Sequence, residues 1–209
     1  MPHVESILSI LHGKEIQSVE VEKARLLRNS GRYLQYDGDY PEAKLRLEKP
    51  FDICNKYLDK RHIDTMESAG ILGWVPASFE KSVGAQPLLE QLLKDRTEVL
   101  GEDDPRTIDC HSDYACALSL TGLGKSEKLQ RDAYHRSLNI LGPEATGTLD
   151  CMAHLAAVLK ERQNFIEAER LFREVWRGKK NLFGHSHQEV LAAEHKSAYV
   201  LSELGDRDD

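Results

Sequence analysis

The sequence predicts an all-α fold, a solenoid of antiparallel helix pairs that recur every 41 to 42 residues. Three observations predict it: a recurring pair of anchor positions, columns of small residues in register with those anchors, and stop signals between the helices. A fixed period between about 20 and about 50 residues is typical of repeat units that bury their apolar faces only by stacking on a neighbour. Four units and a degenerate N-terminal remainder account for the chain.

The anchor pairs set the register. A bulky apolar residue stands seven positions before a second anchor, in the pairs Leu58 and Thr65, Leu100 and Thr107, Leu141 and Thr148, and Phe183 and Val190. Small residues occupy the column eight positions past the second anchor and the column 22 positions before it: Gly73, Ala115, Ala156 and Ala198, then Ala43, Ala85, Ser126 and Ala168. Small residues let two helices approach closely. Counted upstream, the register places Gly31 in the first small column. It places Tyr33 and Leu34 in the apolar columns ten and eleven positions past the second anchor, which hold Val158 and Leu159 in a later unit.

The individual helices follow from apolar spacing and from their end signals. Residues such as Asn164 precede a helix, whereas Gly101, Gly142 and Gly184 suit the end of one. Apolar periodicity predicts helices over 4–12, 17–36, 40–57, 62–76, 83–99, 106–121, 125–140, 147–161, 165–181 and 188–204. We expect a single domain over 1–209, with a lead helix in 1–14, repeats over about 17–58, 62–100, 105–141 and 146–183, and a terminal helix in 187–205.

Composition and charge narrow the function. The net charge of −7 gives no sign of general nucleic-acid binding, no apolar run is long enough to span a membrane, and the start lacks the order of a secretion signal. We expect a cytoplasmic protein. The four cysteines, at 54, 110, 116 and 151, form no CxxC pair, and Cys110 and Cys151 share a column with Ser68 and Ala193. They are therefore interpreted as structural thiols.

Several segments resemble the long tetratricopeptide repeats of kinesin light chains. They are Leu100-Gly101-Glu102-Asp103-Asp104-Pro105-Arg106-Thr107, its copy over 141–148, Asn164-Phe165-Ile166-Glu167-Ala168-Glu169-Arg170-Leu171, His62-Ile63-Asp64-Thr65 and Gly38-Asp39-Tyr40-Pro41-Glu42-Ala43. The likeness covers residues 17 to 204. Similar arrays occur in fungal NB-ARC and NACHT-type NTPases. The opening Pro2-His3-Val4 resembles the start of the helix that often leads into those arrays. However, this sequence contains no phosphate-binding loop.

This resemblance implies a right-handed superhelix whose first helices line a concave groove for a peptide or a partner domain. Kinesin light chains carry paired asparagines five and six positions past the second anchor. This chain instead has pairs such as Ser112 and Asp113, or Ala153 and His154. Their cargo recognition is therefore not expected here.

Helical geometry independently defines a groove stripe at two, six, nine and thirteen positions past the anchors. Its candidate partner-binding residues are Arg25, Asn29, Arg32, Glu67, Trp74, Asp109, Asp113, Asp150, His154, Lys196 and Tyr199. The middle of the stripe is acidic and its ends carry cations, which favours a partner with a basic centre. Two alternatives stay open: the acids only solvate exposed helices, and Trp74 and Tyr199 only pack against neighbouring helices.

The sequence thus predicts a noncatalytic protein-binding scaffold or sensor module, with no catalytic residues, no cofactor and no metal. A zinc site at His185, His187 and His195 lacks any recognised ligand spacing. Pairs of His154 with Asp113 or Cys151 lack an oxyanion donor. The alternative function is an enzyme, or its accessory subunit, that uses the groove as a small-molecule pocket. Because the terminal helix has no second helix to complete its unit, a homodimer through that helix is a further hypothesis.

Overall fold

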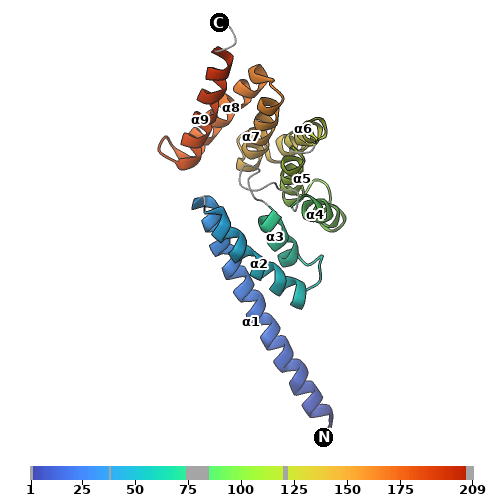
Figure 1. Cartoon of the computed structure of the whole chain (residues 1–209). Coiled ribbons are helices and arrows are strands. Elements are labelled where there is room, and N and C mark those ends of the chain that lie inside the picture. Colours follow the sequence, from blue (N-terminus) through green and yellow to red (C-terminus); the bar gives the residue numbers. More distant parts are fainter. Residues whose placement is uncertain (1, 38, 74–84, 120–121, 206–209) are drawn as a thin grey trace. The chain divides into compact units, whose positions relative to one another are not determined.

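The computed structural model describes residues 2–37, 39–73, 85–119 and 122–205, and within these ranges every regular element is an α-helix. The helices are α1 (Pro2–Asp37), α2 (Tyr40–Tyr57), α3 (Ile63–Gly73), α4 (Ala85–Leu100), α5 (Pro105–Leu118), α6 (Leu123–Leu141), α7 (Thr146–Glu161), α8 (Phe165–Phe183) and α9 (Gln188–Gly205) (Figure 1). They form two compact units, unit 1 over Met1–Val99 and unit 2 over Leu100–Asp209. The all-helical prediction is confirmed.

Unit 1 is built on the pairing of α1 with α2. The two helices approach closely at Gly31, where an added Cβ would lie 2.5 Å from the Leu47 side chain. At the other end of the pair, the Gln17 side-chain amide donates to the Tyr57 carbonyl at 2.7 Å, in the last turn of α2. The part of α1 before Gln17 therefore extends past α2 (Figure 1).

One boundary prediction for this pair is wrong. The sequence predicted separate helices over 4–12 and 17–36, whereas α1 continues without a break through Gly13. A single glycine in an exposed helix costs only about 1 kcal/mol relative to alanine, and no proline follows to stop the helix. The predicted helix 62–76 corresponds to α3, and its last three residues lie outside the described ranges.

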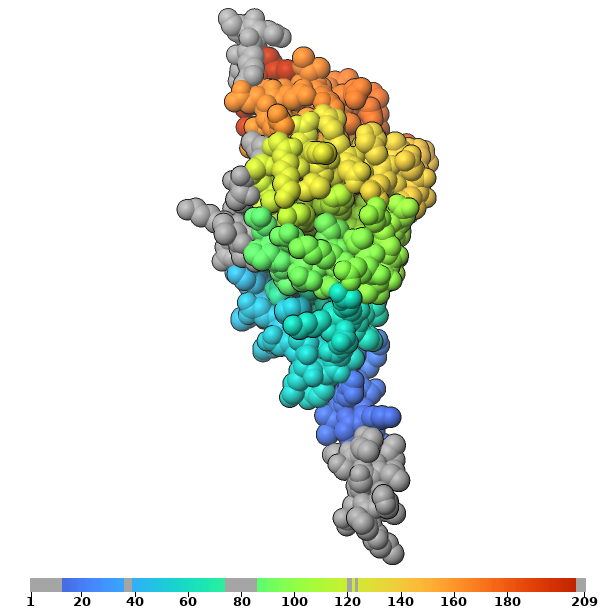
Figure 2. Space-filling view, turned by 90° about the vertical axis from the view of Figure 1, so that its right-hand side faces the viewer, coloured from blue at the N-terminus to red at the C-terminus, as the bar shows by residue number. Residues whose placement is uncertain are grey.

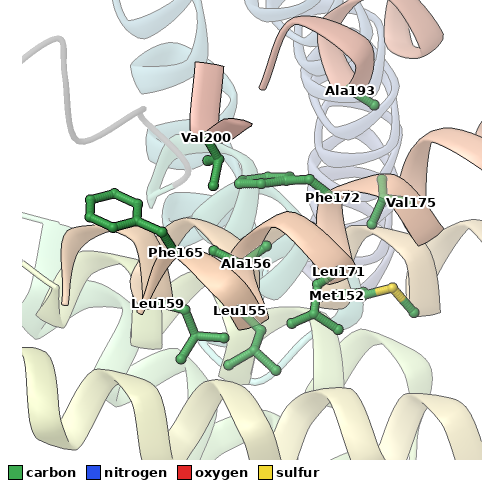
Figure 3. Packing of buried hydrophobic residues seen from close by; sticks show 11 residues of the cluster. Met152, Leu155, Ala156, Leu159, Phe165, Leu171, Phe172, Val175, Ala193 and Val200 are labelled. Atoms are coloured by element: carbon green, nitrogen blue, oxygen red, sulfur yellow. The ribbon is translucent and has the colours of Figure 1, made fainter. Parts of the chain in front are cut away.

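Unit 2 stacks α5 with α6, α7 with α8, and α9 on α8. Figure 3 shows the core between the last three helices, where Leu155 and Leu159 of α7 lie below Phe172 and Val175 of α8. Val200 and Ala193 of α9 complete this cluster. Ala156 and Ala168, one from each small column, are both 0% exposed. Close approach at these two positions is what the small columns predicted.

Glycines end these helices as the sequence predicted, and side-chain caps begin two of them. Gly142 follows α6 with φ +86° and Gly184 follows α8 with φ +79°, values that strain any other residue. Asp104 caps α5 by accepting from the Arg106 amide at 2.9 Å. Asn164 caps α8 through the Glu167 amide. The turns are thus fixed locally, by their own residues.

The second helices of unit 2 also contact one another. Arg131 of α6 donates to both carboxylate oxygens of Glu167 of α8, at 2.8 and 2.9 Å, and the surfaces of the two helices form adjacent bands in Figure 2. This pair raises the pKa of Arg131 and lowers that of Glu167. Among the described residues, no helix combines the length and apolar composition that a membrane span requires.

The small column eight positions past the second anchor is not buried in every repeat. Ala198 of α9 is exposed, and Leu201 beside it is 46% exposed, although the equivalent Ala156 and Leu159 of α7 are buried. In α7 these residues pack against the second helix of the pair, α8. Among the described residues no helix covers the corresponding face of α9.

Candidate functional site

Six of the predicted groove residues lie on the first helices of unit 2, and we call the surface formed by these helices the A-helix surface. α5 contributes Asp109 and Asp113, α7 contributes Asp150 and His154, and α9 contributes Lys196 and Tyr199. Asp113, His154 and Lys196 occupy the same column of three successive first helices. At neutral pH this column runs from a negative through a neutral to a positive side chain.

His154 lies on the middle helix of the A-helix surface, and its ring is positioned by a chain of hydrogen bonds from buried residues. Gln130 of α6, which is 0% exposed, donates from its side-chain amide to the Ser112 hydroxyl at 2.6 Å and to the Cys151 carbonyl at 3.2 Å. The Ser112 hydroxyl lies 2.9 Å from Nδ1 of His154. Donors and acceptors match when Ser112 donates to Nδ1, which assigns the ring proton to Nε2.

The charge state of His154 follows from its surroundings. Desolvation is the main cause that lowers its pKa to about 4; Asp150 opposes this shift, while Lys196 and Lys179 add to it. The imidazole is therefore neutral at physiological pH, with its Nε2–H as a hydrogen-bond donor. A neutral donor of this kind suits a carbonyl or carboxylate oxygen.

Asp150 is paired with a cation that the sequence analysis missed. Lys179 of α8 is largely buried, and its Nζ lies 2.8 Å from Asp150 and 2.7 Å from Glu189. Burial alone would lower the pKa of Lys179, but the two carboxylates outweigh it and raise the value. The sequence does contain a signal that identifies Lys179, because this residue continues the apolar stripe of Phe172 and Val175. A lysine in such a stripe is buried only when it is paired with an acid.

The α9 end of the A-helix surface is cationic. Lys196 is exposed, yet partial loss of hydration and the neighbouring Lys179 and Lys160 lower its pKa. Tyr199 is 48% exposed, and the Lys160 ammonium stands 5.4 Å from the centre of its ring. Crowded cations of this kind favour an anionic group on a partner.

The acidic end lies on α5. An added Cβ at Gly147 of α7 would lie 3.8 Å from the Asp109 carboxylate, which places that acid beside the start of α7. Both Asp109 and Asp113 raise the pKa of the Cys151 thiol, after the larger effect of burial, to about 12. Burial likewise raises the pKa of Cys116 to about 12. Both thiols are protonated at neutral pH and are poor nucleophiles.

The predicted groove residues of unit 1 have different surroundings. Arg25 binds Asp64 through two hydrogen bonds, of 3.0 and 2.7 Å, and Arg28 also contacts this aspartate. Asn29 and Arg32 are exposed. Glu67 lies 3.6 Å from the buried Arg96. Trp74 lies outside the described residues, so its predicted place in the groove stays a prediction.

The histidines and cysteines that the sequence analysis considered as metal-binding or catalytic residues have the following surroundings. No group of three or more His, Cys, Asp or Glu that suits a metal occurs within the described ranges. His187 stacks on Phe183 at 4.6 Å, and its Nδ1 accepts from the Glu189 amide at 3.3 Å. All four cysteines lie in described helices, and none forms a disulfide.

Comparison with known proteins supports the fold. The tetratricopeptide repeat model matches residues 148–189, which include most of α7 and all of α8. No curated protein sequence matches the chain. The similarity to the repeat arrays of fungal NTPases, noted from the sequence, is not shown by these comparisons.

Two crystal structures extend the likeness to nearly the whole chain. One is of nearly identical tetratricopeptide-like repeats described as a kinesin light chain of Podosopora anserina, with a TM-score of 0.62, 22% identity, and 90% of each chain covered. The other is BtubC (BKLC) from P. vanneervenii, with a TM-score of 0.60, 15% identity, and 92% of this chain and 83% of that chain covered. The fold is therefore that of a tetratricopeptide-like solenoid, an architecture that generally mediates protein–protein interactions.

Proposed function

We propose that this protein is a noncatalytic scaffold that binds a peptide or a partner domain on the A-helix surface of unit 2. The observation that carries the proposal is the column of Asp113, His154 and Lys196, whose charge changes stepwise along three successive first helices, α5, α7 and α9. A partner with a basic residue opposite α5 and an oxygen acceptor or acid opposite α7 and α9 complements this gradient. Charge complementarity of this kind sets specificity and raises the association rate.

Two further features support binding rather than catalysis. The thiols of Cys116 and Cys151 have raised pKa values, and the Nδ1 of His154 faces the Ser112 hydroxyl instead of an acid or a thiol. A nucleophile needs a base or a lowered pKa. These side chains therefore stabilise and shape the surface. The cytoplasmic location expected from the sequence is part of the same proposal.

The test uses two synthetic peptide pools with random flanks, one with a central arginine and one with a central glutamate. The full-length protein is immobilised, and the peptides that it retains at low salt are sequenced. We expect enrichment from the arginine pool, and a reversed preference for an Asp109→Lys, Asp113→Lys double variant. Glu144→Lys, at an exposed turn position between α6 and α7, changes charge elsewhere on unit 2 and is the control.

Equal retention of both pools by the native protein and the double variant would contradict the proposal. Asp150→Lys sharpens the test, because Lys179 already compensates the charge of Asp150 at 2.8 Å. In this variant the new lysine repels Lys179, so we expect lower stability together with a weaker preference for the arginine pool. The salt dependence of binding separates a charge effect from unfolding, since only the charge effect fades at high ionic strength.

A further inference from the structure

The outer face of α1 carries an apolar stripe without a partner among the described residues. Val19, Leu26 and Tyr33 are 65%, 70% and 67% exposed and follow one another at intervals of seven residues. The opposite face of α1, with Val21, Ala24 and Gly31, is buried in unit 1. Seven-residue spacing aligns side chains along a helix and is typical of a seam that pairs with another helix.

The described residues equivalent to Leu26 and Tyr33 in the other first helices are buried, which shows the kind of contact that α1 lacks on this face. Leu26 shares a column with four residues that are at most 5% exposed: Ser68, Cys110, Cys151 and Ala193. Tyr33 shares a column with Ala117, Val158 and Val200, which are at most 8% exposed. In unit 1 the column contacts the preceding second helix, because Ser68 Oγ lies 3.7 Å from Cys54 Sγ of α2. Among the described residues no helix covers this column of α1, and its large apolar residues are exposed.

Charge on the same face indicates the orientation of a helix that covers it. The exposed acids Glu15 and Glu22 flank the stripe on its N-terminal half, and the exposed Arg32 flanks it on the C-terminal half. Glu22 and Arg32 lie on the same side of the stripe. An antiparallel helix with a cation near Glu22 and an acid near Arg32 would complement these two residues, and a second copy of α1 meets both conditions.

We propose that two copies of this protein pair through the exposed face of α1, antiparallel and centred on Leu26. Leu26 then contacts Leu26 of the second copy, and Val19 contacts Tyr33 of the second copy. In this register Glu22 comes within two residues of Arg32 of the second copy, an offset of about 3 Å along the helix axis. Two-fold symmetry forms this ion pair twice.

The same geometry limits the strength of the contact. Lys23 and Ser30 stand between the apolar residues of the stripe, and polar residues there set the register at a cost in stability. Glu22 already pairs with Arg25 on its own helix, but such exposed pairs exchange partners readily. A reversible dimer with dissociation constants in the micromolar range is therefore expected. Such a dimer would present two A-helix surfaces and strengthen binding to any partner with two matching segments.

The experiment is sedimentation velocity of the full-length chain from about 1 µM to about 200 µM, a range that spans weak interfaces with few anchors. We expect the mass to rise from monomer to dimer and to stop there. Leu26→Glu should weaken dimerisation by at least about tenfold, because it places two like charges at the centre of the contact. Leu45→Glu is the matched control, since Leu45 lies on α2 of the same unit and is 57% exposed.

Charge reversal tests the register even if Leu26→Glu perturbs folding. Arg32→Glu alone should weaken dimerisation by about two- to fivefold, the range of an exposed ion pair, and the Glu22→Lys, Arg32→Glu double variant should restore it. A monomer at every concentration would overturn the proposal. So would open-ended oligomers, a double variant weaker than the single one, or a dimer lost with Leu191→Glu on the open face of α9 but retained with Leu26→Glu.

Discussion

Asp64 in unit 1 and Asp150 in unit 2 both lie in the first turns of a helix, and both pair with cations from another helix. The Asp64 side chain is 6% exposed and pairs with two arginines, whereas the Asp150 side chain is 51% exposed and contacts one lysine. Hydrogen bonding from Arg25 is the main cause that lowers the pKa of Asp64, against the opposing effect of burial. The same charge pattern is thus structural in one unit and accessible to a partner in the other.

The largest effect should come from the buried member of this comparison. Asp64→Asn keeps the shape of the side chain but removes the carboxylate charge that Arg25 and Arg28 share, so both guanidinium groups lose their ion pair with α3. We expect the free energy of unfolding to fall by about 2–4 kcal/mol in urea titrations followed by circular dichroism. Asp52→Asn, on the exposed side of α2, should change it by less than about 0.5 kcal/mol. Similar losses in both variants would show that burial is not what distinguishes Asp64.

The next effect concerns packing in unit 2. Ala156→Leu introduces extra volume where α7 meets α8, at a residue that is 0% exposed, and should destabilise the protein by about 1–3 kcal/mol. Ala198→Leu makes the same change at the equivalent position of α9, where the residue is exposed. Its effect should be near zero in the same urea titration. A large loss from Ala198→Leu would indicate that the open face of α9 is covered in solution.

The two units should also respond differently to acid. The pKa of His154 is lowered from 6.5 to about 4 in the folded state, so between these values the unfolded chain binds a proton that the folded chain does not. The stability due to neutral His154 is therefore complete above pH 6.5 and is lost as the pH falls toward 4. The pKa of Asp64 is lowered from 3.8, so its contribution is lost only as the pH falls below that value.

Urea midpoints measured at several pH values between 7.5 and 4 test this order. His154→Gln should reduce the decline over that interval without abolishing it, because burial also lowers the pKa of His111. Asp64→Asn should leave the slope in this interval nearly unchanged. A slope that is the same in native protein and His154→Gln would remove His154 as its cause.

The sequence predicted most of this architecture because each element carries its own local signals. Gly142 and Gly184 end helices, Asn164 begins one, and Ala156 and Ala168 mark close contacts. Burial of charge was not predictable in the same way, since it depends on residues distant in the sequence. Arg25 and Asp64 are 39 residues apart, and nothing in the groove stripe distinguishes Arg25 from the exposed Arg32.

Side chains of second helices that contact residues of the A-helix surface from beneath it were missed for the same reason. Gln130 and Lys179 lie on α6 and α8, outside the stripe that helical geometry defined on the first helices. A polar residue that interrupts an apolar stripe is the signal that identifies them, because burial requires it to be hydrogen-bonded or paired. In α1 a local signal was instead misleading, since Gly13 interrupts the apolar pattern but does not end the helix.

The smallest effect should come from the accessible pair. Lys179→Met removes a largely buried cation, but the Asp150 and Glu189 side chains are 51% and 37% exposed and can regain water. We therefore expect a loss of only about 0.5–1.5 kcal/mol in urea titrations, less than for Asp64→Asn. Lys128→Met, on the exposed side of α6, controls for the loss of a charge. The released Asp150 should make the surface more acidic and raise retention of the central-arginine peptides. A loss of stability equal to that of Asp64→Asn would instead make Asp150 a structural residue and leave Asp109 and Asp113 as the acids that face a partner.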